Sequence, residues 1–201
     1  ALRAHGVERL DTLLVSHGDA DHAGGAAAIR EAFAVGEEIG HDGMACRAGQ
    51  SWRRDGVDFT LLHPDRGAWS GNDSSCVLQV TAAGGRSVLL PGDIEAAAER
   101  ALLARGAIRP AEVLLVPHHG SASSSTPGFV AAVKPRLAIA SAGYANRWGF
   151  PDPAVRQRYA GSGVPLWTTG GQGAMQVRLG QRLHFEGFRK RTRRIWRYPA
   201  P

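Results

Sequence analysis

The sequence predicts an α/β fold in which mixed sheets are covered by helices. Short apolar segments alternate with Ala-rich segments of helical composition, which indicates strands interleaved with helices. Two of the apolar segments flank the turn sequence AAGGR, which predicts a hairpin. Several apolar segments also end in clusters of polar residues, a pattern typical of strands at the binding edge of an α/β sheet.

Each predicted strand is a short apolar or alternating run bounded by Gly, Pro or polar residues. In chain order these strands are Leu10–Ser16, Val57–Leu62, Cys76–Thr81, Ser87–Leu90, Val113–Val116, Leu137–Ala142, Leu166–Thr168, Ala174–Leu179 and Leu183–Phe188. The stretch Gly36–Gly56 is the least regular part of the sequence.

The predicted helices lie between these strands. Gly25–Phe33 is rich in Ala, and Ile94–Arg105 is rich in Ala, Leu and Glu with Gly106 placed to end it. Thr126 can cap a third helix, which has Pro127 in its first turn. Pro153–Tyr159 forms a short fourth helix.

The length and charge of the chain indicate one domain with a basic end. The 201 residues contain no apolar run approaching the ~18 residues of a membrane span. The chain opens inside the amphipathic segment ALRAHGVERLD, so we expect a piece of a longer protein. The net charge of +6 arises from Phe188–Arg197, which holds six basic residues and no acidic one. We expect a domain over 1–188 and a tail over 189–201 that either contacts nucleic acid or anionic lipid or is a solvated terminus.

The segment SHGDADHAGG carries the strongest chemical signal. It places His17, Asp19, Asp21 and His22 directly after a predicted strand and before a predicted helix. Imidazole and carboxylate together suit Zn, Mn or Fe, and hard carboxylates move the preference toward Mn and Mg. We therefore predict a divalent metal site. The alternative is that the Asp residues cap the following helix.

A second strand ends at LLPGDIE, and its Asp93 also precedes a predicted helix. A carboxylate in this position can bridge two metal ions, although alone it would be interpreted as a helix cap. Two metals ~3.5–4 Å apart can activate water and stabilise both oxygens of an in-line displacement, which is the chemistry of phosphodiester and ester hydrolysis.

A third strand ends at LLVPHHGSASSST. One of His118 and His119 can bind metal or act as a general acid. The hydroxyl groups that follow, among them Ser121 and Ser123, can hold a phosphate, or they belong to an exposed Ser-rich loop.

These motifs resemble the metallo-β-lactamase superfamily, which has an HxHxDH motif after a strand, a later Gly-Asp and further His ligands. The order HGDADHAGG, NDSSCVL, LLPGDIE, PHHGSASSS and AGYANRWGFP resembles the C-terminal domain of the ComEC family over about Leu10 to Phe188. ComEC proteins are inner-membrane channels of bacterial DNA uptake. The resemblance implies an αββα sandwich, with the N-terminal strands of that fold missing from this chain.

The resemblance also implies roles for individual residues. The metal positions of the superfamily fall on His17, Asp19, Asp21, His22, Asp93 and His119. The implied catalytic residues are Asp21, Asp93, His118 and His119, and a polar motif places Asn72 and Ser75 at the cleft. The implied cofactor is one or two divalent ions, with Mn or Zn preferred over Mg.

The implied activity is that of a metal-dependent nuclease acting on DNA during uptake, with single-stranded DNA as the substrate. The implied partners are the channel domain of the same polypeptide and other competence proteins. The implied location is the inner membrane, with this soluble domain in the periplasm. Because the periplasm is oxidising, Cys46 and Cys76 are expected to form a disulfide that holds Gly36–Gly56 on the second sheet.

Two other functions stay open at this stage. One is a degenerate DNA-binding module, because the family usually has a Gly-His-Pro where this chain has Gly149-Phe150-Pro151, and Phe150 cannot bind metal. The other is a hydrolase of small esters or lactams on the same fold. Trp148 is the preferred candidate for stacking on bases, and His63 is a weaker candidate for the cleft.

Overall fold

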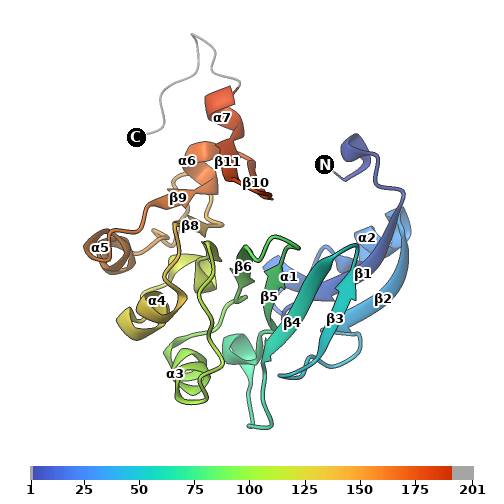
Figure 1. Cartoon of the computed structure of the whole chain (residues 1–201), viewed down its shortest axis with the longest axis horizontal. Coiled ribbons are helices and arrows are strands. Elements are labelled where there is room, and N and C mark those ends of the chain that lie inside the picture. Colours follow the sequence, from blue (N-terminus) through green and yellow to red (C-terminus); the bar gives the residue numbers. More distant parts are fainter. Residues whose placement is uncertain (1, 192–201) are drawn as a thin grey trace.

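A seven-stranded mixed sheet forms the centre of the structure, a computed structural model that describes residues 2–191 (Figure 1). Its strand order is β3-β4-β5-β6-β7-β8-β9. The strands are β3 (Ser51–Arg54), β4 (Val57–His63), β5 (Val77–Thr81), β6 (Ser87–Leu90), β7 (Val113–Leu115), β8 (Leu137–Ala140) and β9 (Leu166–Thr168). Strands β3 to β6 are antiparallel, and β6 to β9 are parallel.

Three helices cover one face of this sheet because parallel strands require crossover connections. They are α3 (Ala96–Ala104), α4 (Pro127–Val133) and α5 (Pro153–Gly161), which lie along one side of the sheet in Figure 1. Leu89, Leu114 and Ala138 point toward them and join Phe129 and Tyr159 in the largest apolar core. The N-cap Thr126 accepts a hydrogen bond from the Phe129 N–H, as the sequence predicts for α4.

The opposite face is covered by two separate two-stranded sheets. One is the parallel pair β1 (Arg9–Val15) and β2 (Ala34–Gly40), and the other is the hairpin of β10 (Met175–Leu179) and β11 (Leu183–Gly187). The first pair packs against β4 and β5 through Leu14 and Ile39. The hairpin packs on β7, β8 and β9, and its Phe185 contacts Trp167 of β9 edge to face.

Two short helices connect β1 to β2, namely α1 (Ala20–Ala23) and α2 (Ala26–Ala32). Because Leu14 and Ile39 face the central sheet, α2 covers the outer face of the pair. The layers are therefore helix, sheet, sheet, helix, and the αββα sandwich expected from the sequence is confirmed. No helix within residues 2–191 is long and apolar enough to cross a membrane.

The predicted strands and helices are all present, and their observed ends lie within two residues of the predicted ones. The segment Gly36–Gly56 differs, because it contains the end of β2 and all of β3. In β2 only Ile39 is fully buried, and β3 lies exposed at a sheet edge with only Trp52 half-buried against Phe59. An exposed strand rich in Glu or Arg lacks the apolar alternation by which strands are predicted.

The basic stretch begins in the short helix α7 (Phe188–Arg191), so the strand predicted to end at Phe188 ends one residue earlier. The rest of the predicted tail, including Trp196, lies outside the described residues.

A disulfide joins Cys46 to Cys76, with the Cα atoms 5.7 Å apart, as expected from the resemblance. It ties the segment between β2 and β3 to the start of β5. Both cysteines are buried in the core between the two sheets, beside Leu61 and Leu78. The disulfide therefore holds together the two layers that meet at this end of the sandwich.

Replacing both cysteines by alanine should lower the free energy of unfolding by about 2–4 kcal/mol, because a closed loop is released in the unfolded chain. Urea unfolding followed by circular dichroism measures this change. Dithiothreitol should destabilise the wild type to a similar extent and leave the double variant unchanged. A wild-type midpoint that dithiothreitol does not move would contradict the prediction.

Candidate metal centre

Three loops at the carboxyl ends of strands bring the predicted site residues to one edge of the sandwich. Asp21 and His22 lie on α1 after β1, and Asp93 follows β6. His119 lies in the short 3₁₀ helix Pro117–Gly120 after β7. The carboxyl ends of parallel strands share one edge of a sheet, so residues far apart in the sequence meet there.

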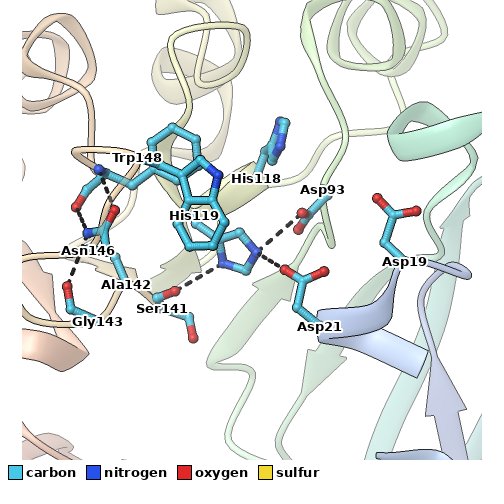
Figure 2. A pocket seen from close by; sticks show the side chains of 11 residues that line it. Asp19, Asp21, Asp93, His118, His119, Ser141, Ala142, Gly143, Asn146 and Trp148 are labelled. Atoms are coloured by element: carbon cyan, nitrogen blue, oxygen red, sulfur yellow. Dashed lines mark hydrogen bonds and ion pairs between the residues drawn. The ribbon is translucent and has the colours of Figure 1, made fainter. Parts of the chain in front are cut away.

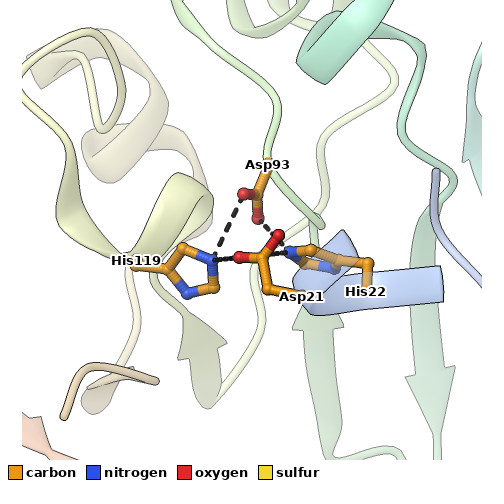
Figure 3. Close-up of side chains that lie close together, drawn as sticks. All are labelled: Asp21, His22, Asp93 and His119. Atoms are coloured by element: carbon orange, nitrogen blue, oxygen red, sulfur yellow. Dashed lines mark hydrogen bonds and ion pairs between the residues drawn. The ribbon is translucent and has the colours of Figure 1, made fainter. Parts of the chain in front are cut away.

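Four donor atoms from these loops lie within 4.8 Å of one another, one each from Asp21, His22, Asp93 and His119. The Asp93 carboxylate lies between two imidazoles, with Oδ1 3.1 Å from His22 Nε2 and Oδ2 3.3 Å from His119 Nε2 (Figure 3). Asp21 Oδ2 is 3.1 Å from His119 Nε2 and 3.8 Å from His22 Nε2. Two carboxylates and two imidazoles thus face a common centre.

The imidazoles are oriented by the oxygen atoms behind them. His119 Nδ1–H donates to the Ser141 carbonyl at 3.0 Å, and His22 Nδ1 is 3.1 Å from Ser16 Oγ. His17 Nδ1 is 3.2 Å from Ser75 Oγ. A metal-ligating His uses its other ring nitrogen in this way, which fixes the ring and leaves Nε2 free to bind.

His17 adds a further donor to the centre. Its side chain is 2% exposed, and its Nε2 has no hydrogen-bond partner among the described residues. Asp19 Oδ2 is 3.6 Å from this atom, and the ring of His17 lies 4.3 Å from that of His22. An unsatisfied buried nitrogen is costly, and a bound cation would satisfy it.

The donor set therefore fits a divalent cation. Asp21, His22, Asp93 and His119 would hold one ion, and His17 with Asp19 could supply ligands to a second. Mixed imidazole and carboxylate donors suit Mn and Zn, and Mg is served by the carboxylates.

In the metal-free protein, contacts within the cluster shift the pKa values of its side chains. Burial alone would raise the pKa of Asp93, but hydrogen bonds from His119 and His22 outweigh it and hold that pKa well below its usual range. The hydrogen bond to Asp93 raises the pKa of His119 to about 9 and also raises the pKa of His22. Burial and the neighbouring His22 lower the pKa of His17.

The His118-His119-Gly120 turn is a strained segment, because all three residues have positive φ values of 47°, 55° and 89°. Gly120 is required in this turn, since a Cβ there would lie 2.6 Å from the Pro151 Cβ. The turn directs His119 into the cluster and His118 along its side.

Buried groups beneath the Ser-rich loop hold this turn in place. Glu99 on α3 is fully buried, and its carboxylate accepts hydrogen bonds from the N–H groups of Ser125 and Thr126 at 2.6 and 2.7 Å. Burial raises the pKa of Glu99, and the two hydrogen bonds partly offset this effect. The Tyr159 hydroxyl is 3.2 Å from Ser125 Oγ. The loop is thereby anchored to two core helices.

His118 belongs to a second polar group next to the cluster. Its Nδ1 lies 3.0 Å from Glu95 Oε1, which also accepts hydrogen bonds from Ser123 Oγ at 2.9 Å and Asn72 Nδ2 at 3.3 Å. Ser121 Oγ is 2.9 Å from Ser123 Oγ. The predicted residues Asn72, Ser121 and Ser123 therefore lie around His118, at the edge of the site.

A hollow of about 450 Å³ opens beside the cluster and is within the usual size of a ligand site. Figure 2 shows the carboxylates of Asp19, Asp21 and Asp93 on one side and Trp148 on the other. Phe150 and Asn146 also line it. Trp148, which the sequence suggests for stacking on bases, is 63% exposed and therefore accessible.

Two sequence-based expectations are corrected. Ser75 is fully buried and cannot contact a substrate; its hydroxyl donates to the Asn72 carbonyl and accepts from the Asp93 N–H at 3.0 Å, so it positions Asp93. His63 is also fully buried and lies behind the cleft, where its Nε2–H donates to the Asp73 carbonyl.

Sequence reasoning gave no role to Glu95, Glu99, Ser16, Ser141 or Asn146. Glu95 and Ser16 stand inside motifs that the sequence singled out, so a polar residue within a motif was the available signal. Glu99 has no such signal, because it lies in a segment whose composition is that of an ordinary helix.

Comparisons with known proteins show which sequences and folds this chain is similar to. A model of the metallo-beta-lactamase superfamily matches residues 1–45. The chain is 40% identical over 90% of its length to "Competence protein ComA" of Neisseria gonorrhoeae, of which it covers 27%. It is 39% identical over 74% of its length to "Recombination protein 2" of Haemophilus influenzae, of which it covers 20%. The chain thus spans between a fifth and about a quarter of the length of these relatives.

Among solved structures, the fold resembles CmlA, a diiron beta-hydroxylase from Streptomyces venezuelae. The TM-score is 0.54 at 13% identity, over 80% of this chain and 44% of CmlA. The sandwich and the cluster at its edge define a domain of the metallo-β-lactamase superfamily. Within that superfamily, the chain belongs to the ComEC family of competence proteins.

The stability of the metal-free protein should depend on pH through His22 and His119. Because their pKa values are raised in the folded state, their contribution is complete below an unfolded pKa near 6.5 and is lost as the pH rises through their folded pKa values, of which that of His119 is about 9. We expect the free energy of unfolding in chelator to fall by roughly 1–3 kcal/mol over this range. Urea titrations at pH 6, 7.5 and 9 measure it.

His119→Asn removes one of the two titrating groups and should flatten this pH profile. Added Mn or Zn should stabilise the wild type most at the upper end of the range, where protons no longer compete for the ligands. A His119→Asn profile parallel to that of the wild type would contradict the assignment.

Proposed function

We propose that this domain is a metal-dependent phosphodiesterase that cleaves DNA. The observation that carries the proposal is the cluster of Asp21, His22, Asp93 and His119, of which Asp21, Asp93 and His119 line a hollow large enough for a nucleotide. Relatives are named as competence and recombination proteins, which supports DNA as the substrate.

Each residue near the hollow has a distinct task in this proposal. The four clustered side chains, with His17 and Asp19, hold one or two divalent ions. When bound, such an ion supplies Lewis-acid activation of a phosphodiester. Glu95 orients His118, whose ring lies at the edge of the hollow and can hydrogen-bond a phosphate oxygen or the leaving oxygen.

The proposed setting rests on the resemblance to the ComEC family. We place the domain on the periplasmic side of the inner membrane, next to a channel domain of the same polypeptide and other competence proteins. The disulfide Cys46–Cys76 supports an oxidising compartment.

The second candidate is a DNA-binding module without catalytic activity. Phe150 favours it, because this side chain lines the hollow 6.0 Å from the His118 ring and supplies no metal ligand. The phosphodiesterase is favoured because four other metal-binding side chains already converge, so the site does not need a ligand at position 150.

Cleavage of a labelled single-stranded oligonucleotide by the full chain tests the proposal. After chelation, activity should be absent and should return with Mn, Zn or Mg. Asp21→Ala should lower kcat/KM by more than about 100-fold, because a direct ligand is lost. The control Asp58→Asn removes a half-exposed carboxylate on β4, which forms an ion pair with Arg53 away from the hollow, and should leave the rate unchanged.

Phe150→His separates the two candidates. Metal-dependent cleavage by the wild type supports the phosphodiesterase. An inactive wild type together with an active Phe150→His variant would show that this chain binds DNA without cutting it. Inactivity of both proteins with all three metals would contradict the proposed chemistry.

A further inference from the structure

A row of aromatic rings leads away from the metal cluster along one wall of the hollow. The ring of His118 lies 6.0 Å from that of Phe150, and Phe150 lies 6.4 Å from Trp148 with the two planes 17° apart. We call these three side chains the aromatic row. Exposure increases along it, from partly buried His118 and Phe150 to Trp148 at 63%.

The loop that carries the row is held in one conformation. Asn146 Oδ1 accepts from the Phe150 N–H at 2.9 Å, and its Nδ2 donates to the carbonyls of Phe150 and Gly143 at 2.7 and 3.1 Å. These hydrogen bonds close the turn from Gly143 to Phe150. The backbone that carries Trp148 and Phe150 is therefore ordered before a ligand arrives, which lowers the entropy cost of binding.

The outer ring, that of Trp148, already stacks against a planar group of this protein. The Arg147 guanidinium lies 4.3 Å from the centroid of the Trp148 ring. A planar base could replace the guanidinium on the indole and release its positive charge to a neighbouring phosphate.

The two walls of the hollow differ in chemistry. Asp21, Asp93 and His119 line one side, and the aromatic row lines the other. A nucleotide has the matching division, with a phosphate for a metal-binding wall and a flat base for an aromatic wall. Stacking on aromatic side chains needs an unpaired base, since the faces of a base inside a duplex are covered by its neighbours.

We propose that the two outer rings of the aromatic row, Phe150 and Trp148, form a base-stacking wall that selects single-stranded DNA and sets the scissile phosphate at the cluster, with His118 at the inner end of the row beside that phosphate. This inference rests on the proposed phosphodiesterase function. It also assigns a task to Phe150, which lies at the middle of the row: this side chain contributes stacking surface where a histidine would contribute a ligand.

Fluorescence anisotropy in chelator tests the row without cleavage. The probe is a fluorescein-labelled oligothymidylate, compared with the same strand built from abasic sites and with a duplex. Repulsion by the metal-free carboxylates is the same in every variant of the row. Trp148→Ala should weaken binding of oligothymidylate roughly tenfold and leave binding of the abasic strand unchanged.

Trp148→Phe and Phe150→Leu serve as matched variants. Trp148→Phe keeps an aromatic face and should bind within about threefold of the wild type, whereas Phe150→Leu, close in volume but not aromatic, should weaken binding several-fold. Equal loss with the abasic strand, no loss in Trp148→Ala, or wild-type affinity for duplex equal to that for single strands would overturn the proposal.

Hydrolysis of bis(p-nitrophenyl) phosphate with Mn distinguishes the two proposals. Its hydrolysis by the wild-type protein reports the metal-dependent chemistry at the cluster without a DNA strand. Wild-type protein that fails to hydrolyse both this ester and DNA would refute the phosphodiesterase function. Normal ester hydrolysis with unaltered DNA binding in the variants would refute the stacking wall alone.

Discussion

The buried carboxylate of Asp93 is the group on which the metal centre depends. It is 5% exposed, and an unpaired carboxylate at this depth would carry a desolvation cost of several kcal/mol. It stays ionised because His22 and His119 meet it from two other loops. Gly92 allows the turn before it, since a Cβ there would lie 2.7 Å from the Ser75 Cβ. The site is therefore complete only when β1, β6 and β7 are already packed together.

Helix α3 links this centre to the rest of the fold. Asp73 caps its start by accepting from the Glu95 N–H at 2.7 Å, which fixes the chain just after Asp93. One side of the helix packs into the core through Ala98 and Leu102. Glu95 and Glu99 point toward the loop after β7 and bind its polar groups. One helix thus sets both the position of Asp93 and the strained turn at His119, so changes in its packing reach both sides of the metal site.

The convergence of the clustered residues could be predicted from sequence because each one directly follows an apolar strand. Strand ends are visible in the hydrophobic pattern, and several His and Asp residues at such ends are rare enough to be informative. The supporting residues could not be predicted in the same way. Glu99 has the composition of a helix surface, and only the fold shows that it is fully buried. Ser75 stands in a polar motif, and its burial turns an expected substrate contact into a support for Asp93.

Charge balance explains why the acidic wall and the aromatic wall belong to one site. Asp19, Asp21 and Asp93 face the hollow, and their charges would repel a phosphodiester. In the metal-free protein, Asp93 raises the pKa values of His22 and His119, which favours protons on these rings that offset part of this charge. Metal ions and protons compete for the same nitrogen lone pairs, so a bound cation would take over this role and leave the cluster able to accept a phosphate. The base is uncharged and gains nothing from that wall; its binding energy must come from a surface beyond the carboxylates, which is where Phe150 and Trp148 lie.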